Sequence, residues 1–130
     1  MEFARMRKEA ALHLFWSSFG ISAYEENTVP TGDSAPAFPY LTYSVATSDL
    51  GRETMISASL WYRSDTWTDI NEKANDIALR IGRGGCVIHC DEGAIWLKKG
   101  LPFSQNMGDE SDDLIKRKYI NIIAEFLTAD

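Results

Sequence analysis

The chain has 130 residues, of which 45% are hydrophobic and 25% charged, and its formal net charge is −6. This length and composition are typical of one globular domain with a core of its own, so we expect a single domain over residues 1–130 that needs neither a disulfide nor a metal ion to fold. The acidic balance argues against a protein that grips nucleic acid through its phosphates, because such proteins carry a basic face.

The sequence favours a cytosolic protein. No stretch reaches the ~18 apolar residues of a membrane span. A signal peptide has a basic segment followed by an uninterrupted apolar one, and here Glu9 and His13 interrupt the apolar segment. In an extended segment Cys86 and Cys90 lie about 13 Å apart at roughly 3.3 Å per residue. A disulfide needs Cα atoms within about 7 Å, so we expect free thiols in a reducing compartment.

The first third of the chain predicts a helix, a short strand and a long loop. Residues 3–18 are rich in helix formers and contain no Pro or Gly. The apolar stripe of this helix consists of Leu12, Phe15, Trp16 and Phe19. A short strand is expected over residues 21–24. The prolines and glycine of residues 25–38 predict an irregular loop, and loops of this length in small domains tend to be functional.

The middle of the chain predicts a β-hairpin followed by an amphipathic helix. Residues 40–46 and 53–63 alternate as strands do, and residues 48–52 between them supply turn chemistry. From about Asp65 to Gly82 the apolar residues recur at helical spacing, so one face of this helix should pack on a sheet. The apolar residues of that face are Trp67, Ile70, Ala74, Ile77, Ala78 and Ile81.

The last third predicts a second hairpin, a long polar loop and a final strand. Residues 86–90 and 94–98 flank the turn residues 91–93, residues 100–113 are mostly polar, and residues 115–127 alternate over a long strand. The fold class that follows is α+β: a mostly antiparallel sheet of about five or six strands, an amphipathic helix packed on one face, and an N-terminal helix.

Candidate sites for metal or catalysis are weak. Strand alternation places Cys86 and Cys90 on one face and His89 on the other, so they do not converge as zinc ligands or as a nucleophile and its base. The glycine-rich residues 80–85 follow a helix, whereas phosphate loops precede one. We therefore expect no enzyme, no catalytic residue, no metal, no cofactor and no small-molecule substrate.

An acidic cluster and four tryptophans are the remaining features. The cluster consists of Asp109, Glu110, Asp112 and Asp113. It lacks the ligand spacing of a calcium loop, so it is either a solvated loop or an electrostatic surface that pairs with the basic residues 116–118 of a neighbouring subunit. The tryptophans either fill the core or mark a subunit interface, because a sheet with helices on one side leaves an apolar face uncovered. The interface residues predicted here are Trp61, Leu79 and Trp96.

The order of these elements resembles the tail-terminator proteins of long-tailed bacteriophages, also described as tail-completion, head–tail-joining or minor capsid-like proteins. The segments that carry the resemblance are the Pro-rich approach Ala35-Pro36-Ala37-Phe38-Pro39, the strand Tyr40-Leu41-Thr42-Tyr43, the strand end Leu60-Trp61-Tyr62-Arg63, the helix beginning near Asp65, and the alternating strand from Lys118 to Leu127. The resemblance covers most of the chain at the level of pattern. The glycine-rich turn at residues 82–85, followed by a strand with two cysteines, differs from the pattern of this family.

The resemblance implies a virion structural protein, assembled in the host cytoplasm and located in the tail or neck. Such a protein forms a ring with copies of itself, typically a hexamer, at the head-proximal end of the tail tube, where it terminates the tail and joins it to the head. Its partners are the tail-tube protein and the head connector protein, and DNA passes through its channel without specific binding. On this resemblance the acidic loop with Asp109, Glu110, Asp112 and Asp113 faces either that channel or a neighbouring subunit. The alternatives are another phage neck, tail or general interaction module and, less favoured by the residues, a small ligand-binding or enzymatic domain.

Overall fold

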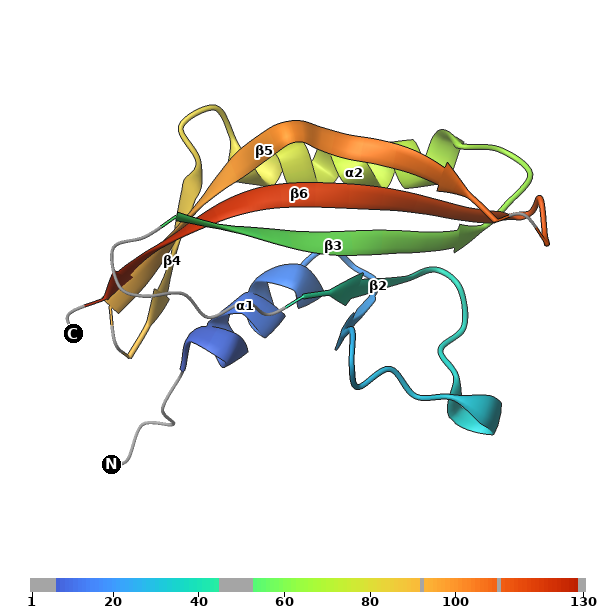
Figure 1. The fold of residues 1–130 in the computed structure, drawn as a ribbon, viewed down its shortest axis with the longest axis horizontal. Helices are drawn as coiled ribbons and strands as arrows, with labels where there is room; N and C mark the ends of the chain where they lie inside the picture. The colour runs from blue at the N-terminus through green and yellow to red at the C-terminus, as the bar shows by residue number, and fades with distance from the viewer. Residues whose placement is uncertain (1–6, 45–52, 92, 110, 129–130) are drawn as a thin grey trace.

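The structure is a computed structural model that describes residues 7–44, 53–91, 93–109 and 111–128, and it shows an α+β fold built on one curled sheet (Figure 1). The helices are α1 (Lys8–Ser17) and α2 (Thr68–Ile81), with a short 3-10 helix at Gly32–Ser34. The strands are β1 (Ser22–Glu25), β2 (Tyr40–Tyr43), β3 (Glu53–Arg63), β4 (Cys86–Cys90), β5 (Gly93–Gly108) and β6 (Ile115–Thr128).

The six strands form one mixed sheet in the order β1-β2-β3-β6-β5-β4. The prediction of a mostly antiparallel sheet is therefore corrected: β1 pairs with β2 in parallel, while the pairs β2–β3, β3–β6, β6–β5 and β5–β4 are antiparallel. The physical reason is the long connection between β1 and β2. A parallel pair needs a connection that carries the chain back to the starting end of the sheet, and residues 26–39 do this.

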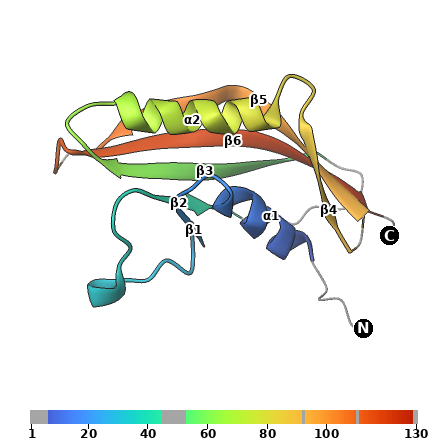
Figure 2. The same cartoon turned by 180° about the vertical axis from the view of Figure 1, so that it is seen from behind.

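Both helices pack on the same side of the sheet. Figure 2 shows α1 and α2 in front of the strands, whereas in Figure 1 the strands β3, β5 and β6 lie in front of α2. The even-numbered residues 56–62 of β3 and 120–126 of β6 point toward the helices and join them in one core. The buried side chains of α2 are Ile70, Ala74, Ile77 and Ile81. Those of α1 in the same core are Leu12, Phe15 and Trp16, and Phe19 joins them just after the helix ends. The predicted apolar stripes of both helices are confirmed.

One predicted loop is wrong, because residues 100–108 belong to β5. Between the pairs Lys99–Ile122 and Ser104–Ile120, β5 has the four residues 100–103 and β6 has only Asn121. Strand β5 therefore forms a bulge with three extra residues there. Gly100 is required at this point, because a Cβ atom on it would lie 2.9 Å from the carbonyl oxygen of Asn121. Only residues 109–114 connect β5 to β6.

The remaining boundaries agree with the sequence, with small shifts. The short strand after α1 and the strand 86–90 are confirmed, and Gly82, at φ +75°, ends α2 in a backbone conformation that favours glycine. Helix α1 begins at Lys8, and residues 3–6 of the predicted helix lie outside the described residues. Residues 45–46 of the predicted strand 40–46, the turn predicted at 48–52 and Glu92 of the turn 91–93 lie outside them as well.

Tyr62 is a buried polar residue of the core, located where β3 passes beneath α2. Its side chain is 8% exposed. Burial, together with the carboxylates of Asp69, Asp76 and Glu72, raises the pKa of Tyr62 to about 12. Both effects disfavour the phenolate, because it would be a charge placed in an apolar core near like charges.

We predict that alkaline pH destabilises the fold through Tyr62. The pKa of an unfolded tyrosine is about 10, so the folded pKa is raised, and this contribution is fully present below pH 10 and is lost as the pH rises toward 12. The slope from one proton is at most about 1.4 kcal/mol per pH unit. Urea unfolding followed by circular dichroism between pH 8 and 11 should show a steeper loss in the wild type than in Tyr62→Phe. Equal pH profiles would contradict the prediction.

Candidate interaction surface

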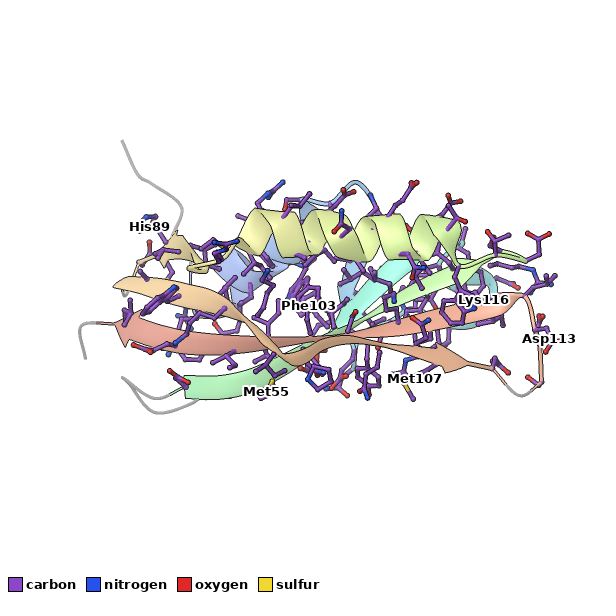
Figure 3. All side chains as sticks on the ribbon, turned by 90° about the horizontal axis from the view of Figure 1, so that it is seen from above. Met55, His89, Phe103, Met107, Asp113 and Lys116 are labelled. Atoms are coloured by element: carbon purple, nitrogen blue, oxygen red, sulfur yellow. The ribbon has the colours of Figure 1, made fainter. Side chains whose placement is uncertain are left out.

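Among the residues that the structure describes, both α-helices lie on one side of the sheet, and we call the opposite side the open face. It is formed by the odd-numbered residues of β3 and β6 and the residues in register with them on the neighbouring strands. Figure 3 shows Met55 and Met107 projecting from this face, away from α2, whereas Phe103 lies between the sheet and α2. Met55 is 53% exposed and Met107 is 40% exposed.

One end of the open face carries a row of side chains that crosses five strands. The row consists of Ser22, Tyr40, Trp61, Arg117 and Met107, one from each of β1, β2, β3, β6 and β5. The rings of Tyr40 and Trp61 stack with centroids 6.0 Å apart and planes 13° apart. The Arg117 guanidinium lies 4.5 Å from the Trp61 ring centroid, as in a cation–π contact.

A second row lies two residues further along the strands and fixes the first. It consists of Tyr24, Thr42, Ser59, Tyr119 and Gln105. Trp61 Nε1 donates a hydrogen bond to Thr42 Oγ1 at 2.9 Å, and Arg117 Nε donates one to Ser59 Oγ at 3.1 Å. The guanidinium of Arg117 also lies 4.5 Å from the Tyr119 ring centroid. These contacts hold the large side chains in place without help from a helix.

The two rows form a pre-arranged aromatic surface around one cation, which we call the aromatic rows. A hollow of about 240 Å³ adjoins them, lined by Trp61, Met107, Gly108, Asp109, Ile115 and Arg117. Sequence reasoning singled out Trp61 but missed Tyr40, Tyr119 and Arg117. The alternation of β6 places Arg117 and Tyr119 on one face of the sheet. Their position beside Trp61 depends on which strands are neighbours, and the alternation does not show this.

The other end of the open face carries Trp96 within a group of charged residues. Trp96 Nε1 donates to the carbonyl of Gly84 at 2.9 Å, and Lys98 Nζ lies 4.4 Å from the ring centroid. Lys98 also contacts Glu53 at 2.8 Å and Glu125 at 3.6 Å. Its hydrogen bond to Glu53 raises the pKa of Lys98 and lowers that of Glu53. Polar and charged neighbours therefore fix the position of Trp96, whereas Trp61 stacks on another aromatic ring.

Leu79 lies on the opposite side of the molecule, on the outer side of α2. Its side chain is 72% exposed. It borders an open groove of about 550 Å³ between the end of α1 and α2, together with Ser18, Phe19, Gly20, Asp76 and Arg80. Arg80 spans this groove, since its Nη1 donates to Ser18 Oγ at 3.0 Å. The structure thus places the predicted interface residues Trp61 and Trp96 on one face and separates Leu79 from them.

The acidic loop lies between β5 and β6, and Glu110 falls outside the described residues. Asp109 accepts hydrogen bonds from the backbone and hydroxyl of Ser111, which lower its pKa. Asp112 accepts from the backbone of Leu114 and pairs with Arg63 at 2.7 Å, and both contacts lower its pKa. Asp113 points away from the end of the sheet in Figure 3. The suggested role of the loop in a channel stays a prediction.

The basic residues after the acidic loop do not act together. Lys116 Nζ lies 5.7 Å from the Trp67 ring centroid and donates to the carbonyl of Asp113. Arg117 belongs to the aromatic rows, and Lys118 is buried on the helix side, where burial lowers its pKa. Strand alternation in β6 therefore divides these residues between two faces.

The cysteine strand has the alternation expected from the sequence. Cys86 and Cys90 are free thiols that pack against the core, while His89 is exposed. Burial raises the pKa of the Cys86 thiol. Within the residues that the structure describes, no group of three or more His, Cys, Asp or Glu side chains comes together in a way that would hold a metal ion.

Comparison with known proteins does not place the chain in a family. No protein-family model matches it, and no curated protein matches its sequence at a significant level. Among the helices in the described parts of the chain, neither α1 nor α2 is long and apolar enough to cross a membrane.

We predict that Trp61 contributes much less to folding stability than Trp16. Trp16 is fully buried in the core, so Trp16→Ala should cost roughly 3–5 kcal/mol. Trp61 is half-buried on the open face, and Trp61→Ala should cost about 1–2 kcal/mol through lost stacking and partial burial. Urea denaturation followed by circular dichroism measures both. Equal losses would mean that Trp61 is a core residue and not a surface residue available to a partner.

Proposed function

We propose that this chain is a virion structural protein of a tailed bacteriophage. In this proposal, copies of the chain form a ring at the head-proximal end of the tail tube, which terminates the tail and joins it to the head. Its partners are further copies of itself, the tail-tube protein and the head connector protein. The function is assembly, and it requires no catalysis, cofactor or small-molecule substrate.

The observation that carries the proposal is the open face with its aromatic rows. A single copy leaves Tyr40, Trp61 and Tyr119 partly in water beside the exposed Met55 and Met107. An aromatic and apolar surface of this kind usually marks a contact with another protein. Because ring stacking and hydrogen bonds already fix these side chains, a partner that docks on them loses little side-chain entropy.

The position of the predicted contact residues supports a ring. Trp61 and Trp96 lie on the open face, and Leu79 lies on the other side of the molecule. Unlike surfaces on different sides of one subunit support head-to-tail association, and a head-to-tail contact makes a ring when its rotation closes. The number of subunits, six, and the location in the virion are inferred from the resemblance in element order to tail-terminator proteins.

The charge distribution supports a channel through which DNA passes without specific binding. The net charge is −6, and the connection between β5 and β6 that carries Asp109, Asp112 and Asp113 projects beyond the end of the sheet (Figure 1). If this loop faces the lumen, its carboxylates repel the phosphates. A DNA-gripping protein would instead present lysines and arginines there.

The first test is the mass of the purified protein by light scattering across a concentration series. We expect a discrete species near six times 14.6 kDa, because a closed ring has a fixed number of subunits. If only monomer is found, the protein should be mixed with tail-tube protein and the tube ends viewed by electron microscopy. Capped tubes of limited length support the proposal. A monomer that neither caps nor shortens tubes contradicts it and leaves an interaction module with another role.

A further inference from the structure

Two of the strand edges that lack a partner in the described residues lie on opposite sides of the sheet. On one side, β1 is the outermost strand. On the other side, β4 pairs only with residues 93–97 of β5, so the remainder of β5 has β6 on one side and no strand on the other. An unpaired edge presents a line of backbone donors and acceptors that can pair with another strand.

The two edges lie at the same level of the sheet. The first of the aromatic rows begins at Ser22 of β1 and ends at Met107 of β5, and the second begins at Tyr24 and ends at Gln105. A second copy placed beside the first at the same level therefore brings residues 22–25 of one copy next to residues 104–107 of the other.

The strand directions also fit. Strand β1 runs parallel to β2, and the three steps from β2 through β3 and β6 to β5 are each antiparallel, so β1 and β5 run in opposite directions. Two copies side by side thus form an antiparallel pair. Its register is Ser22 with Met107, Ala23 with Asn106, Tyr24 with Gln105 and Glu25 with Ser104, and all four pairs follow from the continuity of the two rows.

The free part of β5 lacks the features that usually prevent edge pairing. Natural edges carry lysines, prolines or bulges, and residues 104–108 contain no charged residue and no proline. These protective features are found directly before this segment, in the bulge at residues 100–103, where Pro102 is exposed and Leu101 is 93% exposed. The bulge therefore limits an incoming strand to residues 104–108, and β1 has a matching length of four residues.

We propose that β1 of one copy pairs with residues 104–107 of β5 of the next copy, so that the sheet and its aromatic rows continue from subunit to subunit. This inference rests on the proposed ring and names the sheet edges, and not the surfaces around Trp61 and Leu79, as the contact that builds it. A second copy is the partner that fits, because one chain carries both edges at the same level, in opposite directions and with matching lengths. The contact is heterologous, since each copy uses a different edge toward each neighbour.

Disulfide cross-linking tests the register directly. In the variant Ser22→Cys/Met107→Cys, the two cysteines of one copy lie four strand spacings apart, about 19 Å along the sheet at roughly 4.8 Å per spacing. A disulfide needs Cα atoms within about 7 Å, so it can form only between copies. Ser22→Cys/Met55→Cys is the matched control, because Met55 is an exposed methionine on the same face, at the other end of β3. All variants keep the native Cys86 and Cys90, and the wild type is oxidised in parallel.

We expect the oxidised double variant to give a ladder of covalent multimers on a non-reducing gel, ending at the ring size. An equal mixture of Ser22→Cys and Met107→Cys single variants should give covalent dimers, because each disulfide then uses one copy of each kind. The Met55 control and the wild type should show only traces. Each sample is oxidised alone and in the presence of tail-tube protein.

The outcomes separate the contact from the function. A ring-sized species by light scattering, or capped tubes, without a cross-link overturns the β1–β5 contact and leaves the proposed ring intact. A control that cross-links as well as the double variant also overturns the contact, because the disulfides would then report random collisions. Monomers with uncapped tubes and no cross-link overturn both proposals.

Discussion

Both described helices pack on one side of a single sheet, and this arrangement decides where the chain is buried and where it meets water. The even-numbered residues 56–62 of β3 and 120–126 of β6 lie in the core with α1 and α2, and fully buried side chains such as Trp16, Leu60 and Phe126 lie on that side. In the described parts of the chain, no helix packs on the opposite side. A sheet with one face covered normally places polar residues on the other, so the aromatic side chains on the open face require a separate explanation.

The open face is stabilised by contacts between neighbouring strands. The Tyr40–Trp61 stack, the Arg117 guanidinium beside Trp61, and the hydrogen bonds to Thr42 and Ser59 all join residues that are opposite or diagonal in the register. Cross-strand pairs of this kind contribute roughly 0.2–1 kcal/mol each. The monomer can therefore hold these side chains in one arrangement while leaving much of their surface available, which suits a face that is completed by a partner.

The sequence predicted the elements whose pattern is local and missed what depends on strand pairing. The period of α2 and the alternation in β4 are visible in the residues themselves, so the buried face of α2 and the opposed directions of Cys86 and His89 could be derived from them. The parallel pairing of β1 with β2 and the aromatic rows could not, because they depend on which strands become neighbours. Trp61 and Trp96 carried a recognisable signal as tryptophans on strands. Arg117 looked like one of three consecutive basic residues, and only the register shows its place between two rings.

The bulge in β5 explains why this polar part of a strand has the sequence pattern of a loop, and it also decides which residues reach the open face. Four residues of β5 face one residue of β6, so the bulge adds three residues, an odd number, and exchanges the two faces of β5 beyond it. Before the bulge, even-numbered residues such as Trp96 and Lys98 lie on the open face. After it, Gln105 and Met107 lie there, and Phe103 packs against the core. Without this exchange Asn106 would lie on the open face and Met107 would point toward the helices. The bulge thus places Met107 at the end of the row that contains Trp61, and its exposed Leu101 and Pro102 mark where the unprotected edge begins.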